Sequence, residues 1–166
     1  MYDAREAVRV ALELFDSAAG PGVAVVTDFT AEAGAVEGYR TDLQNAVLNL
    51  CLNARDAMPD GGRLVVRTRA VELSAVDAAA LAPYALAPGR FVSVEVADTG
   101  TGMSPEVLAS CREPFFTTKG EAGTGLGLWM VHCIAAGQGG ALRIESRPGA
   151  GTTVAILLPG ASAHRA

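Results

Sequence analysis

Glycines gather beside one aspartate and one lysine in the second half of the sequence. Residues 98–103 read DTGTGM, residues 113–119 read EPFFTTK and residues 123–128 read GTGLGL. Closely spaced glycines let the backbone approach a ligand, and main-chain N–H groups at a helix start bind phosphate. A P-loop is excluded because Leu126 stands where its lysine would be, and no stretch supplies the dinucleotide pattern GxGxxG. The glycines therefore predict a phosphate site of another architecture.

Asparagines recur on one side of a helix predicted over residues 42–58. Projected at about 100° per residue, Asn45, Asn49, Asn53 and Asp56 fall together. The opposite side is apolar and consists of Leu43, Ala46, Val47, Leu50, Ala54, Ala57 and Met58. Asparagine is a poor helix former, so three at this spacing need a reason beyond solubility. An amide oxygen suits Mg²⁺, whereas the alternative is a hydrogen-bonded surface stripe.

The elements that must position these residues follow from periodicity and capping. Helices are predicted from the capping pair Asp3 and Glu6 to near Gly20, from the capping pair Thr41 and Gln44 to about Met58, and over 126–136. Strands are predicted over 23–29, 64–71, 91–98, 141–147 and 152–159, with a hairpin between the last two. Residues 74–89 form a surface excursion, and residues 103–122 form a long functional loop with one helical turn near 105–109. Together they predict an α/β two-layer sandwich whose mixed, mainly antiparallel sheet is covered on one face by helices.

Length and composition limit the class of protein. The 166 residues are 50% hydrophobic with a net charge of −5, which predicts one globular domain over 1–160 with a flexible tail at 161–166. The acidic balance argues against a nucleic-acid partner. Cys51, Cys111 and Cys133 fit no zinc spacing and are predicted to be free, buried thiols. The sequence has neither a signal peptide nor a membrane-length apolar run, so we expect a soluble, cytoplasmic domain without direct membrane contact, possibly part of a membrane-attached parent.

Five segments together resemble the GHKL family of ATP-binding domains, which includes sensor histidine kinases and DNA gyrase B-type ATPases. LQNAVLNLCLNARDAM at 43–58 resembles the N box, DTGTGM the G1 box, EPFFTTK the F box and GTGLGL the G2 box. GAGTTVAILLP at 149–159 resembles the final glycine box and closing strand. The resemblance spans residues 4–159 and is closest to the histidine kinases. NARDAMPDGG and the excursion ending in PGRFV are similar to the nitrogen-regulation-type and hybrid kinases.

The resemblance implies a Bergerat-like fold that binds ATP and Mg²⁺. It implies that Asn53 coordinates the metal, that Asn49 orders the metal, its waters or the phosphates, and that Asp98 accepts a hydrogen bond from the adenine amine. Residues 103–122 become an ATP lid, Lys119 approaches the phosphates, and Thr152 supports the adenine pocket through water. The implied catalytic residues are Asn49, Asn53 and Lys119. The implied ATP-binding set is Asn49, Asn53, Asp56, Asp98, Gly100, Gly102, Met103, Lys119, Gly123, Thr124, Gly125, Leu126, Gly127, Leu128 and Thr152.

The same resemblance implies the catalytic half of a two-component histidine kinase, which transfers the γ-phosphoryl group to a histidine on a dimerisation domain. A response-regulator receiver domain would act downstream, and the domain alone would show little autophosphorylation. His132 and His164 lack the setting of an acceptor and are interpreted as packing or surface residues. Alternatives are a GHKL hydrolase, which usually carries glutamate where Asn49 stands, an anti-sigma-type Ser/Thr kinase, and a nucleotide-binding switch without chemistry.

The sequence departs from the family pattern just before the F box. Family members commonly carry an aromatic or aliphatic pair there, whereas this chain has Cys111 and Arg112. The change predicts weaker apolar docking of the lid. Arg112 and Arg143 are interpreted as solvated, while Trp129 and Met130 are predicted to pack in the core.

Overall fold

The computed structural model describes residues 1–30, 32–114 and 127–161. Twelve elements follow one another along these residues: β1 (Tyr2–Asp3), α1 (Ala4–Asp16), β2 (Val23–Phe29), β3 (Ala35–Val36), α2 (Arg40–Asp56), β4 (Gly62–Leu73), α3 (Ala75–Ala80), β5 (Gly89–Asp98), α4 (Pro105–Ser110), α5 (Gly127–Gly137), β6 (Ala141–Ser146) and β7 (Thr152–Pro159). The predicted helices and the five long strands are all present. The short β1–β3 pair was not predicted, because two-residue strands leave no periodic signal.

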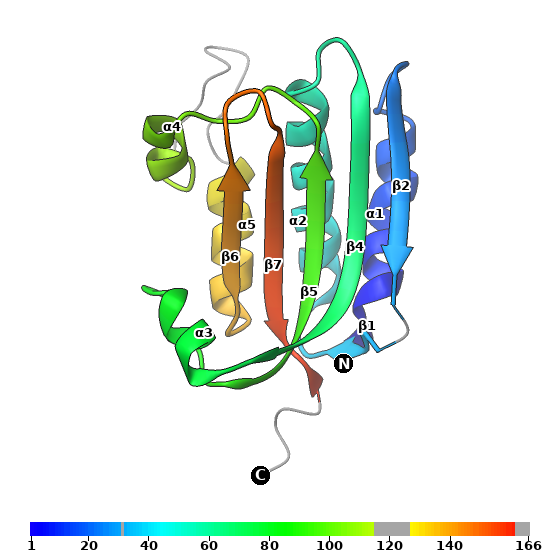
Figure 1. Cartoon of the computed structure of the whole chain (residues 1–166). Coiled ribbons are helices and arrows are strands. Elements are labelled where there is room, and N and C mark those ends of the chain that lie inside the picture. The colour runs from blue at the N-terminus through cyan, green and yellow to red at the C-terminus, as the bar shows by residue number, and fades with distance from the viewer. Residues whose placement is uncertain (31, 115–126, 162–166) are drawn as a thin grey trace.

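The main sheet has five strands in the order β2-β4-β5-β7-β6 (Figure 1). β2 pairs with β4 in parallel, whereas the other three pairs are antiparallel. The prediction of a mixed, mainly antiparallel sheet is therefore confirmed. In register, Asp98 at the end of β5 lies opposite Thr152 at the start of β7, and Ser146 at the end of β6 lies opposite the same threonine. Three strand ends thus meet at one end of the sheet.

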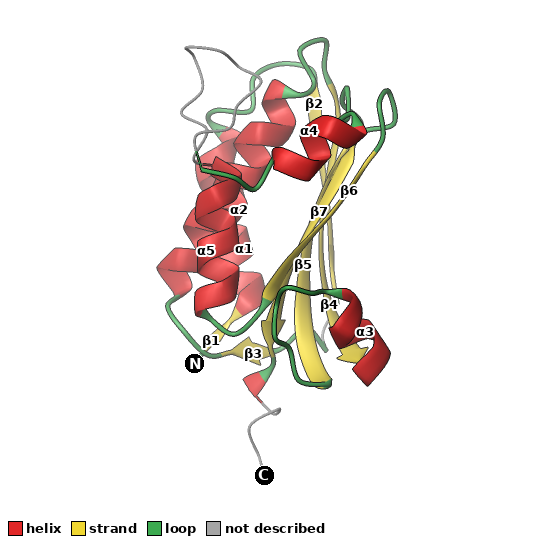
Figure 2. Cartoon of the chain, turned by 90° about the vertical axis from the view of Figure 1, so that its left-hand side faces the viewer, coloured by secondary structure: helices red, strands yellow, loops and turns green. Residues whose placement is uncertain are grey.

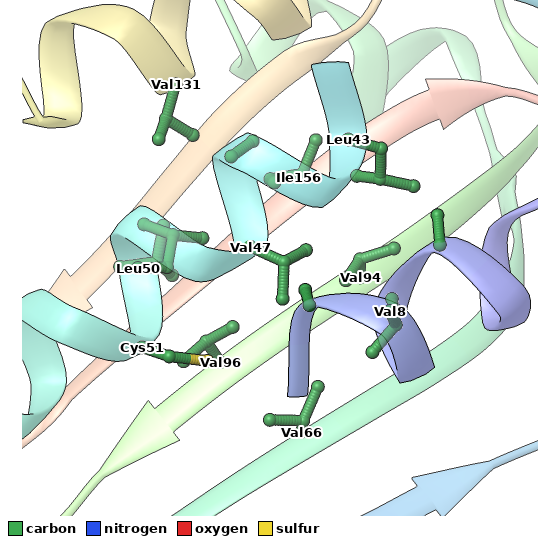
Figure 3. Close-up of a cluster of buried hydrophobic side chains, with 14 of the residues drawn as sticks. Val8, Leu43, Val47, Leu50, Cys51, Val66, Val94, Val96, Val131 and Ile156 are labelled. Atoms are coloured by element: carbon green, nitrogen blue, oxygen red, sulfur yellow. The ribbon is translucent and has the colours of Figure 1, made fainter. Parts of the chain in front are cut away.

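Helices α1, α2 and α5 cover one face of this sheet (Figure 2). The pleat turns Val92, Val94 and Val96 of β5 toward the helices, and all three are buried. Figure 3 shows Val8 of α1 and Val47 of α2 among the valines that the sheet contributes to this core. The apolar side of α2 is buried at Leu43, Ala46, Val47, Leu50, Cys51 and Ala54. Burial of this side orients the asparagine side of the helix away from the sheet.

Part of the opposite face is covered as well, which the sequence prediction did not include. Helix α3 lies on that side of the sheet (Figure 2). Leu73, Phe91 and Leu157 form a second buried cluster, to which Leu81 and Leu86 of the excursion add partly buried side chains. Ser74 and Asp77 form a complete capping box at the start of α3.

The two predicted N-terminal caps have different outcomes. Asp3 does cap α1, and its side chain accepts a hydrogen bond from the Arg5 N–H. The Thr41 and Gln44 signature was wrong, because α2 begins at Arg40 behind Tyr39 without a side-chain cap, and Thr41 lies inside the first turn. None of the helices formed by the described residues combines the length and apolar character that crossing a bilayer requires.

Candidate functional site

The Asp98 carboxylate lies where β5 leaves the sheet, and one of its oxygens carries two main-chain bonds. Oδ1 accepts the Gly100 N–H at 2.8 Å and the Thr152 N–H at 3.2 Å. Oδ2 receives no hydrogen bond from the residues that the structure describes. The two bonds fix the orientation of the carboxylate and leave its second oxygen available to a ligand that donates a hydrogen bond.

Burial raises the pKa of Asp98 above the ordinary value of 3.8. Desolvation is the larger effect, and the N–H groups of Gly100 and Thr152 partly oppose it by favouring the charged form. A half-buried carboxylate with an available oxygen and a raised pKa is typical of a binding site.

Glycines allow three stretches of backbone to pack closely around Asp98. Gly102 has φ +69°, and a Cβ there would overlap the carbonyl oxygen of Arg147. Gly151 has φ +79°, and a Cβ there would overlap the carbonyl oxygen of Asp98 itself. A Cβ at Gly100 would overlap the Ala57 carbonyl oxygen just after α2. These glycines therefore bring the end of α2 and the turn before β7 against the strand that carries Asp98.

Ser146 joins the same region, although sequence reasoning missed it. Its Oγ accepts the Met103 N–H at 2.8 Å, lies 3.1 Å from the Gly151 carbonyl oxygen that it can donate to, and is 2.7 Å from Thr152 Oγ1. One hydroxyl thus connects the start of the 103–122 loop to the start of β7. A serine at a strand end is too common to signal this role, and only its distance from the 149–152 glycine turn could have suggested it.

The asparagine side of α2 divides into a sheltered and an open part. Asn49 and Asn53 are half-buried, whereas Asn45 and Asp56 are exposed. The Asn53 amide lies against the first residue of α5, because a Cβ at Gly127 would be 3.2 Å from Nδ2 and 3.6 Å from Oδ1. Asp56 accepts hydrogen bonds from the guanidinium of Arg55. The structure therefore brings Asn53, rather than Asn45, to the N-terminus of α5.

Several predicted site residues lie outside the described part of the chain. These are Lys119, Gly123, Thr124, Gly125 and Leu126, together with lid residues 115–122 and His164 in the tail. Of the remaining lid and glycine-cluster residues, Met103 and Leu128 are partly buried against the core. The helical turn predicted near 105–109 is confirmed as α4, with Ser104 as its cap.

Four interpretations of single side chains need correction or gain a contact. Arg112 is not simply solvated, because its Nη2 donates to the Leu142 carbonyl oxygen of β6 at 2.9 Å. Met130 is 45% exposed and does not pack in the core. Cys133 is exposed, whereas Cys51 and Cys111 are buried as expected. His132 is a packing residue as interpreted, since its ring is half-buried and its Nδ1 contacts the Tyr84 hydroxyl.

The donor set at the Asn53 end suits a metal that takes few protein ligands. Among the described residues, no group of three or more His, Cys, Asp or Glu side chains gathers to hold a metal ion. Amide oxygens of Asn49 and Asn53 are neutral, hard donors, and Mg²⁺ commonly keeps waters and substrate phosphates in its shell. The residues present therefore fit Mg²⁺ bound together with a phosphorylated ligand, and do not fit a zinc or calcium cage.

Comparison with known sequences identifies relatives of the domain. The family described as histidine kinase-, DNA gyrase B- and HSP90-like ATPase matches residues 38–162. The sensor kinase CckA of Brucella abortus (strain 2308) is 48% identical over 117 residues, which are 70% of this chain and 12% of that protein. The histidine protein kinase DivJ of Caulobacter vibrioides is 35% identical over 167 aligned positions, covering 96% of this chain and 25% of DivJ. The chain thus spans a quarter or less of the length of these relatives.

Solved structures share the fold. The mycobacterial sensor histidine kinase MprB superposes with a TM-score of 0.75 at 27% identity, covering 96% of this chain and 95% of that one. Full-length ShkA in complex with AMPPNP superposes with a TM-score of 0.73 at 25% identity, covering 95% of this chain and 30% of that one. Both likenesses extend over nearly the whole chain, so they include the sheet end that carries Asp98.

Proposed function

We propose, for a chain that belongs to the histidine kinase-, DNA gyrase B- and HSP90-like ATPase family, that it binds Mg-ATP and supplies the catalytic half of a two-component sensor histidine kinase. The γ-phosphoryl group would be transferred to a histidine on a dimerisation domain outside these residues. The names of the relatives support this class, since CckA is a sensor kinase and DivJ a histidine protein kinase. A response-regulator receiver domain is the proposed downstream partner, and the cytoplasm is the proposed location.

The observation that carries the proposal is the geometry of Asp98. Its Oδ1 is occupied by two main-chain N–H groups, which leaves Oδ2 for a donor on the ligand. Adenine offers an exocyclic amine, whereas guanine offers a carbonyl oxygen at the equivalent ring position, which would face the carboxylate with like charge. A site built around a ligand donor discriminates strongly against a base that lacks it. Asp98 would therefore select adenine.

The Asn53 end of the site is suited to phosphates. Gly127 begins α5 beside the Asn53 amide, and the N-terminus of a helix attracts negative charge. Asn53 and Asn49 would hold Mg²⁺, which neutralises charge on the phosphates when it is bound. Lys119 and the main-chain N–H groups of residues 123–127 would contact the phosphates, as the family resemblance implies. Phosphoryl transfer then depends chiefly on positioning and electrostatic stabilisation by these residues.

The acceptor is proposed to come from elsewhere because His132 is already engaged. Its Nδ1 lies 2.5 Å from the Tyr84 hydroxyl, and its ring packs between those of Tyr84 and Trp129. A phosphoacceptor must be able to meet the γ-phosphate, and a half-buried ring in the middle of α5 does not have that freedom.

Phosphorylation in trans tests the proposal. The domain is mixed with ATP and a separately expressed dimerisation domain, and phosphohistidine on the partner is measured for wild type, Asn53→Ala and Asp98→Asn. We expect label with wild type, a large loss with either variant, and negligible label on the domain alone. Equal label with all three proteins would reject the site, and label on serine would favour the anti-sigma-type kinase.

A further inference from the structure

The excursion after α3 reaches the helix that begins at the nucleotide site. Tyr84 lies in the loop between α3 and β5, and its hydroxyl is 2.5 Å from His132 Nδ1 on α5. The two ring centroids are 5.4 Å apart, and the His132 ring is also 5.5 Å from Trp129. Tyr84 and His132 are 48 residues apart in the sequence. The contact therefore ties the excursion to α5 by a directional bond.

Helix α5 has few large side chains with which to fix its position. Val131 and Ala135 are its buried residues within the described range. Most of its other side chains are small or partly exposed, and His132 is its one strongly polar residue. Small buried side chains give a helix little resistance to sliding or rotating on its neighbours. A directional hydrogen bond consequently has an unusually large share in placing this helix.

The surroundings of the bond do not compensate for its loss. Tyr84 and His132 line a cavity of about 560 Å³ together with Arg112, Leu142 and Pro83. Close packing resists movement because neighbouring atoms leave no room, and a cavity removes that resistance on one side. Deleting the hydroxyl would therefore leave α5 able to shift toward the open space.

A shift of α5 would be felt at Asn53. His132 stands five residues after Gly127, about 7.5 Å along the helix axis, and Gly127 packs against the Asn53 amide. We propose that Tyr84 is a positioning residue for the nucleotide site: its hydrogen bond to His132 sets how Gly127 meets Asn53. The effect on nucleotide binding rests on the proposed function, whereas the effect on the Gly127–Asn53 contact does not.

Tyr84→Phe tests this, because it removes the hydroxyl and keeps the ring. Tyr39→Phe is the matched control, since the Tyr39 side chain is 77% exposed. In nucleotide-free protein, we expect the NMR signals of the Gly127 main-chain amide and the Asn53 side-chain amide to move in Tyr84→Phe and to stay in place in Tyr39→Phe. The denaturation midpoint of each variant is measured in parallel.

Binding supplies the second readout. We expect Tyr84→Phe to raise the Kd for Mg-ADP about three- to tenfold, as the loss of one hydrogen bond predicts. Adenosine has no phosphates and contacts only the Asp98 end, so its Kd should be unchanged. In a His132→Gln background, Tyr84→Phe should cause little further loss, because the two side chains act through one bond.

Two outcomes would overturn the inference. One is that Tyr84→Phe leaves both the Gly127 and Asn53 signals and the Mg-ADP affinity at their wild-type values. The other is an equal loss of Mg-ADP and adenosine binding with a lowered denaturation midpoint, which would indicate general destabilisation. If wild-type protein binds no Mg-ADP, the proposed function fails, while the NMR signals still decide whether Tyr84 positions Gly127.

Discussion

The Asp98 carboxylate combines a structural and a recognition role in one side chain. Its Oδ1 connects the exit of β5 to the start of β7 through the Gly100 and Thr152 N–H groups, while Oδ2 is left for the ligand. Asparagine at this position would keep an oxygen for the two N–H groups but present an NH₂ group to the adenine amine. Two donors would then face each other, so Asp98→Asn is expected to damage recognition more than folding.

Proton release on adenosine binding is a prediction that follows from the raised pKa of Asp98. Burial holds this pKa above 3.8 in the free protein, and an amine donor on Oδ2 would favour the charged form and lower it. Adenosine affinity should therefore rise with pH through the window above 3.8 and level off once Asp98 is ionised in the free protein. Calorimetry in mildly acidic buffers of different ionisation enthalpy measures the released proton. Proton uptake, or the same pH dependence in Asp98→Asn, would contradict this assignment.

Asn53→Ala should remove most of the benefit of Mg²⁺. In wild type we expect Mg²⁺ to tighten ADP binding, and in Asn53→Ala we expect this gain to shrink by about tenfold or more, as loss of a bond to a charged group predicts. Asn45→Ala is the control, because Asn45 lies on the same side of α2 two turns earlier and is exposed. ADP titrations with Mg²⁺ and with a chelator measure the gain. A similar change in both variants would argue against a metal site at Asn53.

Individual residues could be predicted from the sequence where their type is unusual for its place. Asn49 and Asn53 stood out because asparagine disfavours helices, and Asp98 stood out because glycines follow it. Ser146 could not be found, because serine is ordinary at a strand end and its partners come from two other segments. Arg112 was misjudged for a similar reason, since its carbonyl partner is contributed by a strand 30 residues later.

Among the elements, the turns that carry glycine decide how closely the strands and α2 approach one another. Gly102 and Gly149 share a left-handed backbone, with φ +69° and +76°. Their surroundings differ, because a Cβ at Gly102 would overlap the Arg147 carbonyl oxygen whereas a Cβ at Gly149 would meet nothing within 4 Å. The pair therefore separates backbone strain from close approach.

Alanine at these two positions should have unequal costs. Gly149→Ala is expected to lower the free energy of unfolding by about 1–2 kcal/mol, which is the strain of a left-handed non-glycine residue. Gly102→Ala adds steric overlap and is expected to cost about 2–5 kcal/mol in total. Chemical denaturation measures both values. Equal costs would show that the contact with Arg147 does not restrict Gly102.

Element boundaries were predictable wherever one strong periodic pattern met a clear stop. The β2 and β7 ranges agree with the sequence prediction, because alternation or an apolar run ends at glycine or proline. The start of α2 was misplaced because the Thr41 capping pattern outweighed the position of Tyr39 in the prediction. The contact of the excursion with α5 through Tyr84 was beyond sequence reasoning, since it depends on how the chain passes the β6 edge.

At the scale of the whole molecule, the site is assembled from strand ends and helix ends that meet at one end of the sheet. β5 and β6 end there and β7 begins there (Figure 1). The chain represents 12% of CckA and 25% of DivJ, so the remaining parts of such proteins would supply the acceptor and the signal. A domain of this kind needs only to hold one nucleotide in a fixed orientation, and every contact described above serves that orientation.

Calorimetric titration with Mg²⁺ present tests the central claim most directly, comparing a non-hydrolysable ATP analogue with its guanosine counterpart on wild type and Asp98→Asn. Asp16→Asn serves as the control, because Asp16 is exposed at the end of α1, far along the chain from the site. We predict saturable binding of one adenosine nucleotide to wild type and Asp16→Asn, with affinity about tenfold or more weaker in Asp98→Asn, and little binding of the guanosine nucleotide. Equal affinity for the two bases, or an Asp98→Asn variant that binds ATP analogue as wild type does, would contradict the account.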